Sequence, residues 1–306
     1  MAQSNEIHIR IDSVASYHEM MGIEKPMHPL FSIIDFSKIT YSHPKETCYI
    51  HSNLYNISVK SGADCILQYG PHHFDFTQGA MSFFKPGQTI KVDPNAAIVK
   101  DGFTINFHPD FLRTFPLDKK IQRYDFFDYK VNEALFLSDE EKAQCHAIAK
   151  GIETEYKSKI DSYSQEAIVS FLDLLLVYGK RFYDRQFITR KTHQRPIVAQ
   201  FEELLDAYFH EELHLQKGLP NVKYFAEAVH MSPNYLSDLL RTSTGKSAQS
   251  HIQSKLIEVA KTMLSSTVLS VSEIAYQLGF EQAQSFNRLF KSKTNQTPLE
   301  FRASFN

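Results

Sequence analysis

The sequence predicts a two-domain α+β protein, with an N-terminal domain built on a small antiparallel β-barrel and an all-α C-terminal domain that carries tandem helix-turn-helix motifs. Three observations lead to this prediction. Short apolar runs separated by turn residues dominate the first third of the chain, helical periodicity begins near residue 138, and two similar helical patterns follow each other near the C-terminus. At 306 residues, the chain is long enough for two hydrophobic cores.

The predicted strands lie between about residues 30 and 99 and continue through 102–107. Short runs of β-branched and aromatic residues occur there, and glycine- and proline-containing turns such as Gly70-Pro71 and Pro86-Gly87 separate them. Short strands at this regular spacing favour a small antiparallel barrel or sandwich.

Two helices are predicted to follow the strands. Ser138 and Glu141 form a capping signal for the first helix. The second extends from Ser164 to about Tyr183 and has a wide apolar stripe, which either covers one end of the barrel or forms a dimer interface; one helix can do both. The candidate interface residues are Ile168, Leu172, Leu175 and Leu176.

The polar, basic segment 185–196 ends in a proline and is predicted to be the interdomain linker. It would separate an N-terminal sensory and dimerisation domain, residues 1–184, from a C-terminal DNA-binding domain, residues 197–306. The first helix of that second domain is expected to span residues 197–213.

The first helix-turn-helix pattern has apolar residues at helical spacing on both sides of a turn near Ser232. Ser232 is a good N-cap, Pro233 suits the first helical position, and Gly245 can end the helix in a left-handed conformation. The outward residues of this helix are expected to be Asn234, Tyr235, Ser237, Asp238 and Arg241. Asp238 either accepts from a cytosine or holds Arg241 in place.

The second pattern repeats the same apolar spacing, with one extra residue in its turn, and its last helix is expected to begin near Gln282. Gln284 and Arg288 lie one turn apart, where base edges are reached, whereas Lys291 and Lys293 suit phosphates. A connecting helix, from Ser247 to about Leu264, would be about 25 Å long. That length suits two recognition helices about 34 Å apart, one turn of DNA.

Charge is unevenly distributed although the formal net charge is only −2. Basic residues gather between Lys180 and Arg195 and again from Arg241 onward, while the segment from Glu202 to Asp238 is acidic. This distribution indicates one face offered to phosphates and another to protein.

No catalytic site, metal site or cofactor is expected. The adjacent pair His72 and His73 is the one cluster that resembles a metal site, but no suitable glutamate follows it. The three cysteines lack zinc-binding spacing and are expected to be reduced thiols, with a redox sensor as the alternative. Because no signal peptide or membrane-spanning run is present, we expect a soluble, cytoplasmic protein without membrane contacts.

The C-terminal residues resemble the AraC/XylS family of bacterial transcription regulators. The resemblance rests on Ala226, Ser232-Pro233 and Thr244–Lys246 in the first motif, and on Ile274-Ala275, Leu278–Phe280 and Thr297-Pro298 in the second. It implies two recognition helices and activation of transcription through contact with RNA polymerase. By position, the base-contact candidates are Asn234, Ser237, Asp238, Arg241, Ala283, Gln284, Ser285 and Arg288, and the phosphate-contact candidates are Lys246, Lys291 and Lys293.

Some residues depart from the family pattern. Asn295 stands where glycine is usual, but asparagine tolerates the left-handed backbone that a turn needs there. Lys255 replaces a usual arginine in the connecting helix, and Glu281-Gln282 replaces the commoner Ser-Asp cap, so the second recognition helix is expected to start less firmly.

The N-terminal half resembles the cupin-like sensory domains of this family in its layout and in the Lys85–Gln88 turn. We therefore expect a homodimeric activator that binds double-stranded DNA and responds to a small effector in the barrel. The many phenylalanine and tyrosine residues suit an apolar or ring-shaped ligand, or a dry core. In the alternatives, the barrel only dimerises or binds protein, or it is a cupin-type enzyme fused to a DNA-binding domain.

Overall fold

The computed structural model describes residues 7–39, 47–61, 66–69, 72–75, 79–92, 101–130, 133–159, 161–189 and 191–304. Side chains within 66–69, 72–75 and 191–195 are not described. The chain forms two compact units, Met1–Gln186 and Phe187–Asn306. Within the described ranges, no helix is long and apolar enough to span a membrane.

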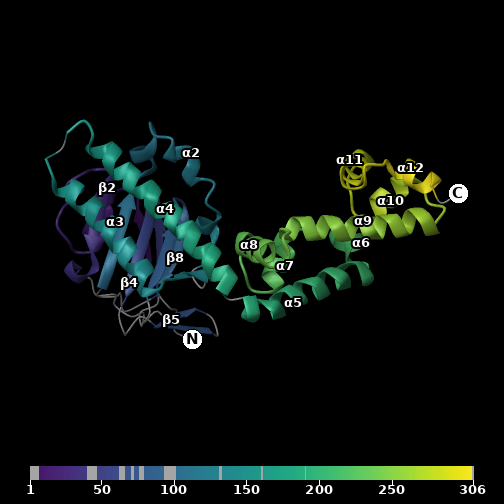
Figure 1. The fold of residues 1–306 in the computed structure, drawn as a ribbon, viewed down its shortest axis with the longest axis horizontal. Helices are drawn as coiled ribbons and strands as arrows, with labels where there is room; N and C mark the ends of the chain where they lie inside the picture. Colours follow the sequence, from purple (N-terminus) through teal and green to yellow (C-terminus); the bar gives the residue numbers. More distant parts are fainter. Residues whose placement is uncertain are drawn as a thin grey trace. The chain divides into compact units, whose positions relative to one another are not determined.

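The N-terminal unit contains a five-stranded antiparallel sheet in the order β10-β7-β4-β9-β2 and a three-stranded sheet in the order β1-β3-β8 (Figure 1). A separate hairpin joins β5 to β6. No sheet closes on itself in the described part of the chain, so the strands are confirmed and the predicted barrel is not. The strands are β1 (Ile7–Ile11), β2 (Phe31–Asp35), β3 (Cys48–Ser52), β4 (Tyr55–Ser61), β5 (Ile66–Tyr69), β6 (His72–Asp75), β7 (Ala80–Phe84), β8 (Gln88–Val92), β9 (Asp101–Phe107) and β10 (Leu135–Phe136).

Two long helices, α3 (Asp139–Lys157) and α4 (Ser164–Thr189), cover the apolar face of the five-stranded sheet (Figure 1). Tyr156 of α3 makes an edge contact with Phe31, with ring centroids 5.7 Å apart. Gly179 of α4 lies so close to the sheet that a Cβ atom there would come within 2.7 Å of Phe83. The predicted capping box at Ser138 is present, with both of its reciprocal hydrogen bonds.

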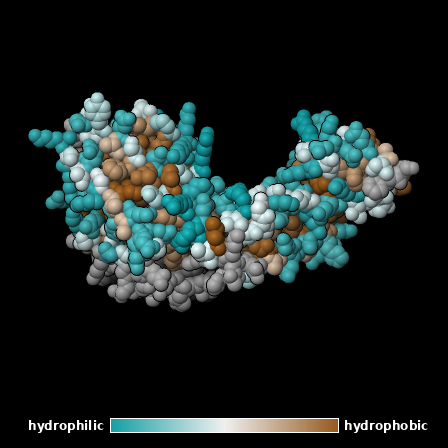
Figure 2. All heavy atoms as spheres, viewed as in Figure 1, coloured by the Kyte–Doolittle hydropathy of each residue, from teal (hydrophilic) through white to brown (hydrophobic). Residues whose placement is uncertain are grey.

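The apolar stripe of α4 packs inside the unit, the first of the two alternatives that the sequence left open, and not on an outer surface. Ile168, Leu172, Leu175 and Leu176 are all buried within the single chain, where they pack into the unit's own core. The outer side of α4 instead exposes Leu174 (44%) and Val177 (45%), and apolar side chains gather over this helix in Figure 2. The periodicity located the apolar residues, but the helix is apolar on more than one side.

The segment predicted as a linker is helical wherever it is described, because α4 continues to Thr189 and α5 (Lys191–His210) includes Pro196. Arg185 donates two hydrogen bonds to the carboxylate of Glu141, at 2.8 and 2.7 Å, and a third to the carbonyl of Phe136. These bonds hold the side chain of the first residue of the predicted linker against α3 and β10. The predicted limits of the two functional domains, residues 1–184 and 197–306, stay a prediction.

The start of the chain holds two elements that the sequence did not predict, β1 and the short helix α1 (Val14–Met20). Ser13 caps α1 in a capping box with Ser16. Ile11 and Val14 are buried together with Leu54. Further short elements are α2 (Leu117–Ile121) and 3₁₀ turns at Phe36–Lys38, Pro109–Leu112 and Asp125–Asp128.

The C-terminal unit is all helical and has one continuous core. The central helix α9 supplies Ile252, Leu256, Ala260 and Leu264 to that core, which extends from Phe201 of α5 to Phe290 of α11. The remaining helices are α6 (Leu213–Lys217), α7 (Val222–Ala228), α8 (Pro233–Thr244), α9 (Ala248–Ser266), α10 (Val271–Gln277), α11 (Ala283–Thr294) and α12 (Pro298–Ala303). The sequence did not predict α6, which begins after a left-handed residue at Glu212.

Truncating Leu172 should destabilise the protein far more than truncating Leu174, two residues away on the same helix. Leu172→Ala removes fully buried methyl groups and is expected to cost about 2–5 kcal/mol. Leu174→Ala removes atoms that are exposed in the single chain and, at a protein concentration at which the chain is monomeric, should change stability by less than about 0.5 kcal/mol. Urea unfolding followed by circular dichroism measures both; equal losses would contradict the assignment of Leu172 to the core.

Candidate nucleic-acid interface

The turn between α7 and α8 depends on one left-handed residue, His230, whose φ is 59°. The amide of Met231 donates back to the carbonyl of Ala226 at 2.8 Å, and that of Val229 donates to Phe225 at 3.1 Å. These bonds satisfy the carbonyls at the end of α7 and reverse the chain into α8.

The turn between α10 and α11 has the same hydrogen bonds at equivalent positions. Gly279 is left-handed with a φ of 89°, Phe280 donates to Ala275 at 3.0 Å, and Leu278 donates to Ile274 at 2.9 Å. The two motifs therefore share backbone geometry as well as apolar spacing. The sequence did not identify His230 as the counterpart of Gly279, because histidine is uncommon at a positive φ.

The first recognition helix, α8, has the predicted ends. The Ser232 hydroxyl accepts from the amide of Tyr235 at 3.3 Å, and Gly245 follows the helix in the left-handed conformation. The hydroxyl of Thr244 lies 2.7 Å from Nε2 of His251 on α9. Burial lowers the pKa of His251, which favours the neutral ring in this contact.

The second recognition helix, α11, also begins and ends as expected. Gln282 is its N-cap and makes no side-chain capping bond, which matches the weaker start predicted for this helix. Asn295 takes the left-handed conformation, with a φ of 59°, so it replaces the usual glycine without changing the turn. Lys255 forms an ion pair with Asp206 of α5 at 2.6 Å, so the connecting helix is tied to α5.

The outward face of α11 is polar and open to solvent. Gln284, Ser285 and Arg288 are exposed, whereas Ala283 is partly buried against the core. Lys291 and Lys293 are exposed toward the end of the helix. The structure thus gathers the predicted base-contact and phosphate-contact candidates of this motif on one helix, with Phe286 and Phe290 buried behind them.

The outward face of α8 is less open. Asn234, Ser237 and Asp238 are only partly exposed, and Tyr235, expected to face outward, is buried. Arg241 is exposed and donates a hydrogen bond to the carboxylate of Asp238, so this acidic residue holds the arginine in place. Lys246 is exposed just beyond the helix.

The described residues give no support to a metal site or a reactive thiol among the other candidates, the histidine pair and the cysteines. The side chains of His72 and His73 lie outside the described residues, as does Cys65, and no metal-binding cluster occurs among the residues that are described. Cys48 and Cys145 are buried and free. Burial raises the pKa of Cys145 to about 12, which keeps this thiol protonated and unreactive.

With this geometry established, comparison with known proteins identifies the motif. A family described as "Helix-turn-helix domain" matches residues 225–304, from within α7 through α12. These residues form an AraC-type helix-turn-helix domain.

Whole proteins are also similar to this chain over part of its length. An uncharacterized HTH-type transcriptional regulator of Staphylococcus aureus (strain MSSA476) is 35% identical over 139 residues, covering 45% of this chain and 17% of that protein. The uncharacterized HTH-type transcriptional regulator YijO of Escherichia coli (strain K12) is 35% identical over 80 residues, covering 26% of this chain and 28% of YijO. The chain therefore spans less than a third of either relative.

A solved structure is similar to about a third of the chain. It is the C-terminal domain of the two-component response regulator yesN from Fusobacterium nucleatum, which is 28% identical with a TM-score of 0.28. The alignment covers 33% of this chain and 96% of that domain.

Gly279→Ala should destabilise the AraC-type domain more than Gly245→Ala. Both glycines have positive φ values, so each alanine costs about 1–2 kcal/mol in backbone conformation. At Gly279 the added Cβ would also lie 2.7 Å from the backbone carbon of Gly218, whereas nothing lies within 4 Å at Gly245. Thermal unfolding of both variants measures the difference; equal shifts would mean that the Gly279 turn does not pack closely.

Proposed function

We propose that this chain is a sequence-specific regulator of transcription that binds double-stranded DNA through α8 and α11. The observation that carries the proposal is the repeated motif: two helix pairs with the same turn geometry share one core, and each presents a helix with polar outward residues. A short turn followed by such a helix is how many proteins place side chains in the major groove.

The two recognition helices are proposed to contribute unequally. On α11, Gln284 and Arg288 are exposed and suit hydrogen bonds to base edges. On α8, Arg241 is already paired with Asp238, which favours a positioning contact with phosphate over base selection. We assign Lys246, Lys291 and Lys293 to phosphates.

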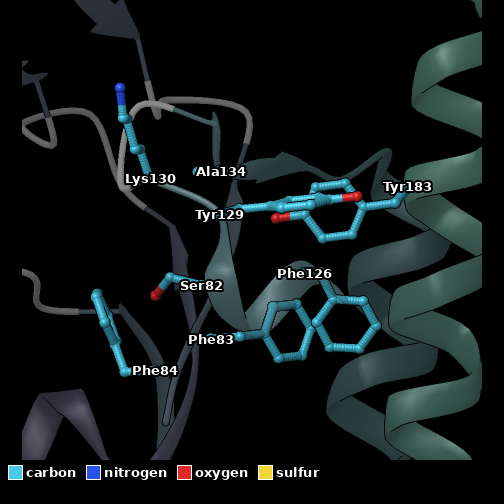
Figure 3. Close-up of a pocket in the computed structure, with 8 residues that line it drawn as sticks. All are labelled: Ser82, Phe83, Phe84, Phe126, Tyr129, Lys130, Ala134 and Tyr183. Atoms are coloured by element: carbon cyan, nitrogen blue, oxygen red, sulfur yellow. The ribbon is translucent and has the colours of Figure 1, made fainter. Parts of the chain in front are cut away.

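The N-terminal unit is proposed to have a cupin-like fold, to bind a small effector and to control the DNA-binding unit. The buried hydroxyls of Ser32 and of Ser82 (Figure 3), which have no hydrogen-bond partner among the described residues, support effector binding over a purely structural role. Activation through contact with RNA polymerase is implied by the family resemblance alone. The competing hypothesis is a regulator that binds no effector, and a measurement of ligand binding distinguishes the two. No feature of the described residues favours a cupin-type enzyme.

We also propose that the protein forms a homodimer through the outer side of α4. Leu174 and Val177 lie one turn apart and are exposed, and Phe171 is partly exposed beside them. Exposed apolar residues at this spacing are typical of a surface that a second helix covers. These residues replace the buried set that the sequence suggested.

Arg288→Ala and Lys291→Ala should weaken DNA binding in different ways. Loss of a base contact by Arg288 should cost about 1–3 kcal/mol and relax the preference at one base position. Loss of a phosphate contact by Lys291 should weaken binding to all sequences alike. It should also reduce the slope of log K against log salt concentration by about one. Fluorescence anisotropy at several salt concentrations measures both. Unchanged sequence preference in Arg288→Ala would contradict the proposed position of α11 in the groove.

The dimer is tested by Leu174→Glu combined with Val177→Glu. Two charges on the proposed interface should convert the protein to a monomer without unfolding it, because both side chains are exposed in the single chain. Analytical ultracentrifugation reports the mass, with Lys25→Glu as an exposed control. Persistent dimers in the double variant would place the interface elsewhere.

A further inference from the structure

The two helix-turn-helix motifs share the core around α9, and they also meet where two backbone segments touch. The loop between α6 and α7, residues 218–221, lies against the turn between α10 and α11. A Cβ atom added at Gly279 would lie 2.7 Å from the carbonyl carbon of Gly218 and 2.8 Å from the amide nitrogen of Leu219. We call this the loop–turn contact and define it by Gly218, Leu219 and Gly279.

The loop side of the contact is fixed by α5 and α6. The buried side chain of Tyr208 on α5 donates its hydroxyl hydrogen to the carbonyl of Gly218 at 3.1 Å. The amide of Gly218 donates to the carbonyl of His214 at 3.1 Å. The ring of Tyr208 also packs edge-on against Phe225 of α7, with ring centroids 5.8 Å apart. The backbone of Gly218 is therefore bonded to the helices that precede the first motif, and Tyr208 connects it to that motif.

The turn side of the contact is fixed by the second motif. The amide of Gly279 donates to the carbonyl of Tyr276 at 3.0 Å, and the next residue, Phe280, is buried. The ring of Phe280 packs on Phe286 of α11, with ring centroids 5.4 Å apart. Because Phe286 belongs to the second recognition helix, a displacement of Gly279 also displaces the start of that helix.

The missing side chain at position 279 serves the contact between the motifs more than the turn itself. The equivalent residue of the first turn is His230, which has a positive φ of 59° and carries a full side chain. A left-handed turn of this kind therefore does not demand glycine. At Gly279 the loop leaves no space for a Cβ, whereas nothing lies within 4 Å of the same position at Gly218. Glycine at position 279 thus allows the two backbones to approach each other closely.

The loop–turn contact joins the motifs a second time, beside α9. Figure 1 shows α7 and α8 toward one end of α9, and α10 and α11 toward the other end. A motif packed near one end of a helix can still tilt through small sliding movements of its side chains. A tilt of the second motif toward the loop would make backbone atoms overlap, and a tilt away from it would uncover Leu219, which packs against the shared core.

This second connection bears on the spacing of the DNA segments that α8 and α11 are proposed to contact. One base pair inserted between two such segments moves one of them by about 3.4 Å along the DNA and by about a tenth of a turn around it. Two helices held by α9 and by the loop–turn contact cannot follow that change, so a base contact is lost or the DNA is deformed. Two helices held by α9 alone could follow part of it.

We propose that the loop–turn contact makes the domain selective for the spacing between two DNA segments, in addition to their sequence. Tyr208 and Gly279 are positioning residues in this proposal, because they act by holding α8 and α11 at one separation and one orientation. The inference rests on the proposed binding of DNA through these two helices.

Competition binding with the full-length protein tests the selectivity for spacing. The probes are the DNA site that the protein selects from a random library and the same site with one base pair inserted or removed between its two protected segments. The wild-type protein should bind the altered sites at least about tenfold more weakly, the factor for the loss of one good base contact. Equal affinity for all three sites overturns the proposal.

Gly279→Ala should reduce this selectivity, because the added Cβ displaces the turn from the loop. The ratio of the affinities for the original and the altered sites should fall at least about threefold. The matched control is Gly245→Ala, which strains another left-handed residue where nothing lies within 4 Å, so its ratio should equal that of the wild type. A folded Gly279→Ala variant with the wild-type ratio overturns the proposal.

Tyr208→Phe provides a second variant, which retains the ring and removes only the hydrogen bond to the carbonyl of Gly218. If circular dichroism shows that Gly279→Ala does not fold, the ratio measured for Tyr208→Phe decides. It should fall at least about twofold below the wild-type ratio. An unchanged ratio in that case overturns the proposal.

Distances between the motifs, measured in the full-length protein without DNA, distinguish the failure of this inference from the failure of the proposed function. Spin labels are introduced through a noncanonical amino acid at the exposed residues Ala228 of α7 and Gln277 of α10, so that the three cysteines stay unlabelled. Pulsed electron paramagnetic resonance should give one narrow distance distribution in the wild type and a broader or longer one in Gly279→Ala. Identical distributions overturn the inference.

The two measurements together assign any failure. If a DNA site is selected and the spacing ratios of the variants do not change, the inference about the loop–turn contact fails and the regulator proposal stands. If the distances change as expected and no DNA site is selected, the regulator proposal fails, and selectivity for DNA spacing fails with it.

Discussion

The AraC-type domain depends on the burial of one helix, α9, between the two helix-turn-helix motifs. Because Ile252, Leu256, Ala260 and Leu264 belong to a core that both motifs share, neither recognition helix can shift without repacking that core. At about 1.5 Å per residue, the 19 residues of α9 are about 28 Å long. Packing along this helix therefore sets the separation of α8 and α11, which we propose to contact successive turns of DNA.

The sequence predicted the helices of this half of the molecule well, because residues close to each helix end in the chain determine where that helix begins and ends. Helix ends follow from capping residues such as Ser232 and from left-handed residues such as Gly245 and Asn295, which act within a few positions. The periodicity did not show which of the outward residues would be exposed and available to contact DNA. The buried position of Tyr235 depends on neighbours that the spacing does not reveal. The pairing of Arg241 with Asp238, three residues earlier, is one of the two roles expected for this aspartate.

The N-terminal half was less predictable, because its chemistry arises from pairing between distant strands. Ser32, Asn56 and Asn106 are ordinary polar residues in the sequence, and only the register brings them into one row. The stripe on α4 left core and dimer interface open as alternatives for a related reason. Apolar spacing identifies a buried side of a helix, but it does not distinguish a core within the chain from a partner, and Leu172 proved to be core.

The most direct test is selection of DNA fragments from a random library by the full-length protein, followed by footprinting of the enriched site. The account predicts one enriched motif with two protected major-groove segments about one helical turn, ~34 Å, apart on the same face of the DNA. It also predicts that Arg288→Ala changes the preferred base in one of these segments. A library that shows no enriched motif would contradict the central claim.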